Sequence, residues 1–264
     1  MLKKLIKYEF KSTGRTFLPI YGALLASALI TRLMMWGDNI SALNNAFLYN
    51  LLSGLTAVLF VAMLVATFVA TLIVVLQRFS KNLLGEEGYL SMTLPVKPWQ
   101  HILSKSLVAV FWYFASWTAA VLSFIVLMWN RFIVRDILRA VTFFFTKIQW
   151  DGQSILTVVE IILLSAVSIF CAVLLMYASL SLGQLSRRGR KLASFGYFLA
   201  LALVSEFIIG VASRAFSSVL SYHILNTFSG FQTLIFFLFS LMGLLSAAYF
   251  FLANYMLSRK LNLE

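Results

Sequence analysis

Residues 51–77 read LLSGLTAVLFVAMLVATFVATLIVVLQ and contain no charged side chain. A helix that crosses the roughly 30 Å hydrocarbon layer of a bilayer needs about 20 mostly apolar residues. The chain holds five further runs of this kind: 17–36, 107–129, 155–183, 192–212 and 233–256. Backbone amides find no water within lipid, and the chain lacks the alternating pattern of a membrane barrel. The sequence therefore predicts an all-α polytopic membrane protein, one transmembrane domain with six transmembrane helices.

The composition excludes the other broad classes. Of the 264 residues, 61% are hydrophobic and 11% are charged, whereas soluble domains have roughly 45–50% apolar and about 25% charged residues. Disordered chains are poor in apolar residues, so disorder is excluded as well. The single cysteine, Cys171, rules out an internal disulfide and a cysteine-based zinc site, and we interpret it as a small buried hydrophobe. His101 and His223 are expected on opposite sides of the membrane, so no metal site is predicted.

The net charge of +12 is explained by membrane topology. Fifteen Lys and Arg residues fall in the N-terminal segment, the second and fourth connections and the C-terminal tail, and six fall on the other side. The positive-inside bias predicts that both termini are cytoplasmic, which agrees with an even number of spans. Because the charges cluster between apolar runs, no nucleic-acid partner is expected.

Residues 1–16 predict an amphipathic interfacial helix on the inner membrane surface, ended by Gly14. Basic side chains with a spacing of four residues, Lys3, Lys7 and Lys11, lie opposite an apolar face. Glu9 falls within that apolar face. Since an unpaired carboxylate is costly there, Glu9 is either solvated or locally paired, or it faces a cytoplasmic partner.

Residues 78–106 form the predicted cytoplasmic segment between the second and third spans. Glycines and prolines interrupt it, and several of its side chains are apolar although the segment is expected in water: Leu90, Met92, Leu94, Val96 and Trp99. Exposed apolar residues held by such chain breaks indicate a docking surface. The alternative is that the segment folds back onto its own helix ends.

The layout and two stretches resemble a known family. A basic amphipathic start (KKLIKYEFKSTGR), a long second span and the segment GEEGYLSMTLPVKPWQHILSKSL at 85–107 are similar to the six-span ABC-2 type permeases of bacterial ATP-driven exporters. The resemblance covers the whole chain in layout, and its specific part is residues 1–22 and 85–107. It implies an interfacial connecting helix at the N-terminus, a coupling helix that enters a groove of a separate ATP-binding subunit, and the bacterial plasma membrane. The contacts that it implies are Glu86, Glu87, Tyr89, Leu94, Pro95 and Trp99.

The chain has no Gly-x-x-x-x-Gly-Lys-Ser/Thr phosphate loop. ATP and Mg²⁺ are therefore expected on a partner ATPase, which the resemblance implies in two copies. This chain is expected to be neither an enzyme nor a cofactor-binding protein. Six helices enclose little room, so a second copy or a homologous permease is expected to complete the pathway. Membrane lipids are the remaining expected partners.

Three ionisable residues fall inside the apolar runs, where charge is expensive and often functional: Arg32, Glu160 and Glu206. All three are expected within about 10 Å of the outer boundary. Our hypothesis is that Arg32 pairs with one of the glutamates, which closes an extracellular gate or presents charge to a cationic substrate. The alternative is a purely structural pair, or side chains that reach the interface.

The predicted outer connection, 130–154, carries arginines with a spacing of four residues: Arg131, Arg135 and Arg139. An interfacial helix among lipid phosphates explains them simply. A role in guiding an amphiphilic or anionic substrate is the alternative.

The leading functional hypothesis is export of an amphiphilic substrate such as a peptide, a lipid or a drug, which suits the 16% aromatic residues. An ion-coupled secondary transporter that uses Glu160 and Glu206 is one alternative. A non-transporting membrane immunity or scaffold protein is another. An intramembrane enzyme is disfavoured because no His, Asp or Lys lies in any predicted span.

Overall fold

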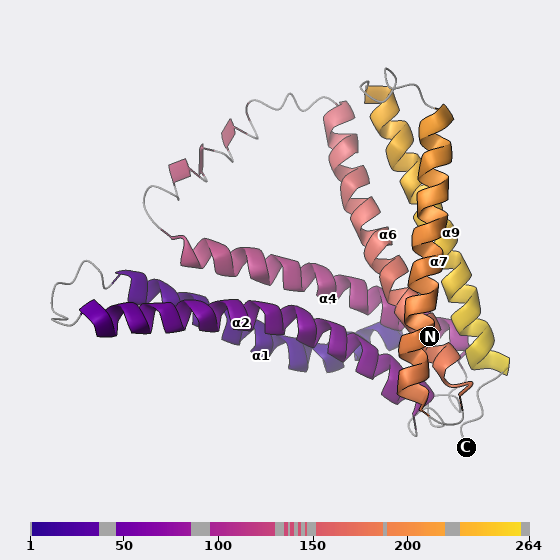
Figure 1. The fold of residues 1–264 in the computed structure, drawn as a ribbon, viewed down its shortest axis with the longest axis horizontal. Helices are drawn as coiled ribbons and strands as arrows, with labels where there is room; N and C mark the ends of the chain where they lie inside the picture. Colours follow the sequence, from indigo (N-terminus) through magenta and orange to yellow (C-terminus); the bar gives the residue numbers. More distant parts are fainter. Residues whose placement is uncertain are drawn as a thin grey trace. The chain divides into compact units, whose positions relative to one another are not determined.

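The computed structural model describes residues 2–36, 46–85, 96–129, 135–136, 138–139, 142–143, 146, 152–186, 189–219 and 228–259 (Figure 1). Its helices are α1 (Leu2–Trp36), α2 (Ala46–Phe79), α4 (Pro98–Leu127), α6 (Gly152–Gly183), α7 (Arg190–Val219) and α9 (Phe228–Arg259). A π-helical turn, η2 (Ser80–Leu84), extends α2. These described stretches contain no strand.

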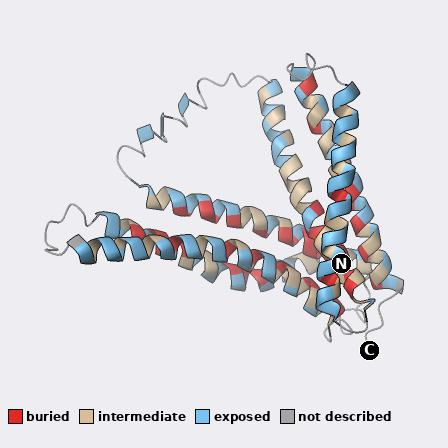
Figure 2. Cartoon of the chain, viewed as in Figure 1, coloured by how far each residue is buried: buried red, intermediate tan, exposed pale blue. Residues whose placement is uncertain are grey.

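Among the described residues, six helices are long and apolar enough to cross a membrane, which confirms the all-α prediction with six candidate spans. Each has at least 30 residues and therefore measures about 45 Å or more. A helix of that length extends beyond the roughly 30 Å hydrocarbon layer. Pale blue, exposed positions run along the helices (Figure 2), and many of them are large and apolar, as for Phe207 at 73% exposure. Such surfaces suit lipid rather than water.

The predicted spans fall inside these helices, except that Met128 and Trp129 follow the end of α4. The helices extend further than the predicted spans at most ends. Hydropathy detects only the part of a helix that suits lipid. The helix itself continues for as long as its backbone amides and carbonyls bond to one another.

The prediction that a helix ends at Gly14 is wrong, because α1 continues through Gly14 and Pro19 to Trp36. Gly14 is buried, and a Cβ atom built on it would lie 3.6 Å from the Trp112 ring. Packing against an indole offsets the roughly 1 kcal/mol that glycine costs in a helix. The segment predicted to be interfacial is thus the first part of one continuous helix.

The predicted segment 78–106 is divided between two helix ends and a connection. α2 and η2 reach Leu84, and α4 begins at Pro98. Proline suits a first helical position because the amide hydrogen that it lacks has no partner there. The connection between the helices is therefore residues 85–97, of which 86–95 lie outside the described residues.

The described residues form two compact units. Unit 1 comprises residues 2–7, 75–110 and 152–259, and unit 2 comprises 8–74 and 111–146. Within unit 1, α6 packs against α7 and α9. Within unit 2, α1, α2 and α4 lie side by side (Figure 1), joined by contacts such as Thr31 Oγ1 to the Thr56 carbonyl, 3.0 Å. α1, α2 and α4 each contribute residues to both units.

Candidate functional site: the helix ends at the 85–97 connection and the α1–α4 groove

In unit 1 the end of α2 is anchored on α6. The ring of Phe79 stacks on the ring of Tyr177, with centroids 4.0 Å apart and planes 9° apart. Both side chains are fully buried, and so is Leu83 in η2. A buried aromatic stack of this kind stabilises more than its area alone, by about 0.5–1.5 kcal/mol. The helix end that leads into the 85–97 connection is thus fixed to α6.

The beginning of α4 is buried in the same unit. His101, Ser104 and Lys105 are each no more than 5% exposed. Ser104 Oγ donates to the His101 carbonyl at 3.0 Å. By sequence, Lys105 is one of the fifteen basic residues that predict the cytoplasmic side, and its four-residue spacing from His101 places both on one helix face. A buried lysine needs compensating polar partners, so this face of α4 is a structural element rather than a wet surface.

Trp99, on the first turn of α4, has 36% of its surface exposed. It is the one member of the six implied ATPase contacts that the described part of the chain includes. Glu86, Glu87, Tyr89, Leu94 and Pro95 lie outside the described residues. The coupling contacts therefore stay a prediction.

Unit 2 is organised around Trp112 of α4. Its ring stacks with Phe17 at 4.6 Å and with Phe10 at 5.2 Å, both on α1. Its indole nitrogen, Nε1, donates to Thr13 Oγ1 at 2.8 Å. Trp112 is buried together with Thr13 and Phe17. These contacts fix the first turns of α1 against α4.

A buried hydroxyl chain links all three helices of unit 2. The Tyr21 hydroxyl lies 2.8 Å from Ser116 Oγ, which lies 2.8 Å from Thr71 Oγ1. Thr71 donates to the Thr67 carbonyl at 2.8 Å. One consistent assignment has Tyr21 donating to Ser116 and Ser116 donating to Thr71. Hydrogen bonds between membrane helices contribute about 0.6–2 kcal/mol each, so this chain holds α1, α2 and α4 together.

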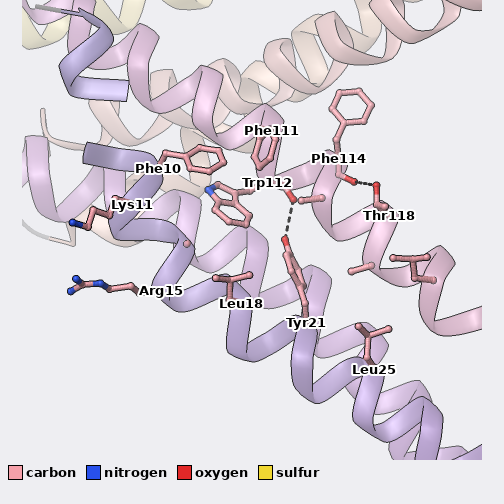
Figure 3. Close-up of a pocket in the computed structure, with 14 residues that line it drawn as sticks. Phe10, Lys11, Arg15, Leu18, Tyr21, Leu25, Phe111, Trp112, Phe114 and Thr118 are labelled. Carbon is pink, nitrogen blue, oxygen red and sulfur yellow. Dashed lines mark hydrogen bonds between the residues drawn. The ribbon is translucent and has the colours of Figure 1, made fainter. Parts of the chain in front are cut away.

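A groove of about 800 Å³ in unit 2 is lined by Trp112, Tyr21 and their neighbours (Figure 3). α1 lines it from Phe10 to Leu25, and α4 lines it from Phe111 to Leu122. Most of the lining is apolar, and the cationic side chains are Lys11 and Arg15, both exposed. The sequence gives no signal of this groove, because its walls come from segments about 100 residues apart.

The predicted intramembrane charges are distributed over both units. Arg32, half-buried on α1, belongs to unit 2, whereas Glu160 and Glu206 belong to unit 1. Glu206 is exposed on α7. Glu160 is half-buried on α6, and its Oε2 atom is buried without a hydrogen-bond partner among the described residues. The pairing of Arg32 with either glutamate stays a prediction.

The remaining predicted site residues that the structure describes lie on exposed or partly exposed helix surfaces. Lys3 and Lys7 are exposed and Glu9 is half-buried. Arg135 and Arg139 are exposed and helical, and Arg139 pairs with Asp136 at 3.5 Å, whereas Arg131 lies outside the described residues. Cys171 is buried in α6. Across the described ranges, no group of His, Cys, Asp and Glu could hold a metal ion.

The six apolar helices make the chain a multi-pass membrane protein. No protein-family model, no curated protein and no solved structure matches it.

Proposed function

We propose that this protein is the membrane-spanning subunit of an ATP-binding cassette exporter and that a separate ATPase subunit drives export of an amphiphilic substrate. The observation that carries the proposal is the short 85–97 connection between two anchored helix ends. Phe79 fixes one end through its stack on Tyr177. The other end is fixed by the buried face of α4 around Lys105. A partner that moves the connection would move both helix ends with it.

The sequence supports the same arrangement. GEEGYLSMTLP at 85–95 carries apolar side chains between glycines and a proline, and Trp99 adds an exposed indole on the first turn of α4. Aromatic residues are frequent anchors of protein interfaces. In the proposed complex, Glu86, Glu87, Tyr89, Leu94, Pro95 and Trp99 contact the ATPase.

The proposed assembly also contains ATPase subunits and a second permease. Its sequence has no phosphate loop, so ATP and Mg²⁺ are held by two partner ATPase subunits. A second copy of this chain, or a homologous permease, completes the pathway. We place the complex in the bacterial plasma membrane with both termini cytoplasmic, in agreement with the distribution of Lys and Arg.

Leu94→Asp tests the proposal, with Leu185→Asp as a matched control. Leu185 is 46% exposed in the turn after α6, and it is predicted on the same side of the membrane. Each variant is purified from its native membrane in mild detergent, and partners with a phosphate loop are identified by mass spectrometry. ATP hydrolysis by the recovered complex is measured in parallel.

We expect wild type and Leu185→Asp to retain an active ATPase subunit and Leu94→Asp to lose it while still inserting in the membrane. An absence of any ATPase with wild type would contradict the exporter. Equal loss with both variants would contradict the role of the 85–97 connection.

A proton-coupled carrier is the second candidate, and Glu160 is the observation that favours it. A buried carboxylate oxygen without a hydrogen-bond partner among the described residues suits a group that binds and releases a proton. Glu160→Gln would then abolish transport that a proton gradient drives in ATP-free vesicles, and Asp136→Asn, which changes an exposed carboxylate outside the candidate spans, serves as the control. Transport that requires ATP and ignores the gradient would exclude this candidate.

A further inference from the structure

The groove between α1 and α4 has about the length of one leaflet of a bilayer. From Arg15 to Leu25 it follows α1 for ten residues, which corresponds to about 15 Å along the helix. The hydrocarbon layer is about 30 Å thick, so one leaflet has about the same length. The walls along this stretch are apolar and include Leu18, Leu25 and Leu122.

One end of the groove is basic. Lys11 and Arg15 are one helical turn apart on the same face of α1, and their side chains extend on the same side (Figure 3). None of the fourteen residues that line the groove is acidic. Both side chains are exposed, so an anionic group can reach them. Arginine binds phosphate oxygens in a bidentate manner, and lysine adds a point charge.

Two aromatic side chains that line the groove, Trp112 of α4 and Tyr21 of α1, are held by contacts of their own. Trp112 is held by its stack on Phe17 and by its hydrogen bond to Thr13. Tyr21 is held by its contact with Ser116. An apolar groove on a membrane helix pair is filled by the amphiphile around it, and phospholipid is the amphiphile that surrounds such helices. The groove therefore needs no large rearrangement to accept a chain.

We propose that this groove binds one anionic phospholipid of the inner leaflet. The lipid phosphate lies at Lys11 and Arg15, and one acyl chain runs along Leu18, Leu25 and Leu122. Basic pockets between membrane helices bind anionic headgroups through the same chemistry. The site fixes α1 to α4 at the membrane surface, and it does not depend on the proposed ATPase partner.

The test uses nanodiscs that contain equal parts of phosphatidylglycerol and phosphatidylcholine. The protein is released into mild detergent, and the phospholipid that stays bound is counted by class with native mass spectrometry. Lys11→Gln/Arg15→Gln removes the basic end. Lys3→Gln/Lys7→Gln removes two exposed charges with the same spacing on the same helix but outside the groove, and Ala115→Leu narrows the groove itself.

Wild type should retain one phosphatidylglycerol per chain. Lys11→Gln/Arg15→Gln should weaken its retention by about 30-fold, from about 1 kcal/mol for each basic residue, and Lys3→Gln/Lys7→Gln should leave it unchanged. Ala115→Leu should lower retention of both lipid classes. Equal loss from the two charge variants would show general surface attraction and overturn the site. The site would also be overturned if wild type retained no phospholipid. The same holds if another amphiphile or a second copy of the chain filled the groove.

The charge variants are informative even if Ala115→Leu does not fold. Lys11 and Arg15 are exposed, so their replacement should not alter the unfolding temperature in lipid-free detergent. Loss of the ATPase partner in the experiment on Leu94 would leave the lipid site untouched, and loss of the lipid would leave the exporter untouched.

Discussion

Gly183 in unit 1 is a position where an added methyl group should destabilise the fold strongly. A Cβ atom at this glycine would lie 1.9 Å from Ser194 Oγ and 2.8 Å from both the Cα and Cβ atoms of Ser194. The Ser194 hydroxyl can rotate away, but its Cα atom is part of the α7 backbone. Gly183→Ala must therefore move α7 away from α6 locally.

The expected cost is that of overpacking a helix interface, about 1–3 kcal/mol of unfolding free energy. Gly14→Ala is the matched control, because its new Cβ would meet the Trp112 ring at 3.6 Å, an ordinary van der Waals distance. There the methyl group should be neutral or stabilise α1 by up to about 1 kcal/mol through helix propensity.

Both variants can be compared with wild type by thermal unfolding in one detergent. We expect Gly183→Ala to unfold at a clearly lower temperature and Gly14→Ala at the same or a higher one. Ser194→Gly in the Gly183→Ala background should recover part of the loss, since it removes the side chain at position 194 and leaves only the α7 backbone against the new methyl group. An unchanged unfolding temperature for Gly183→Ala would refute the close approach of α6 and α7.

Three further predictions follow from named contacts. Ser116→Ala should destabilise unit 2 by about 1–2 kcal/mol, because Tyr21 and Thr71 lose their shared partner. Thr118→Ala should cost less, because it removes only a bond to the Phe114 carbonyl of its own helix. Chemical denaturation in detergent measures both changes in unfolding free energy. Phe79→Ala should lower the unfolding free energy by about 3–5 kcal/mol through the lost stack and the cavity against Tyr177. In the proposed exporter it should also reduce substrate-stimulated ATP hydrolysis. A stable variant with full stimulation would contradict the anchoring role of Phe79. Arg32→Glu should impair transport and the added change Glu160→Arg or Glu206→Arg should restore it if the pairing hypothesis holds; no recovery in either double variant would reject that hypothesis.

The six helices were predictable from sequence, whereas their ends and contacts were not. An apolar run such as 51–77 indicates a membrane helix through its own composition. The extension of α2 to Leu84 was not visible, because the last turns pass through a polar stretch and are fixed by a distant partner, Tyr177. The prediction that Gly14 ends a helix is wrong for a similar reason. Its effect on the helix depends on Trp112, which lies 98 residues further along the chain.

The candidate site shows the same division. The sequence identified Trp99 as an apolar residue near the 85–97 connection, and the structure leaves it partly exposed. It did not reveal that Lys105 is buried, because a lysine beside an apolar run has the same sequence signature whether it is solvated or buried. Nor did it reveal the α1–α4 groove, since Lys11 and Leu122 become neighbours of one cavity only through folding.

Ring stacking occurs in both units, at Trp112 in unit 2 and at Phe79 in unit 1, and unit 2 adds a chain of directional hydroxyl bonds. This addition bears on where motion could enter. In unit 2, a chain of hydroxyl groups from Tyr21 through Ser116 to Thr71 fixes three helices with directional bonds. In unit 1, α6 approaches α7 closely at Gly183, and Phe79 holds the end of α2 by ring stacking. A stack tolerates sliding more readily than a buried hydroxyl chain tolerates separation, because its attraction is less directional than a hydrogen bond. In the proposed exporter, a pull on the 85–97 connection would therefore shift the Phe79 contact before it disrupts the hydroxyl chain of unit 2.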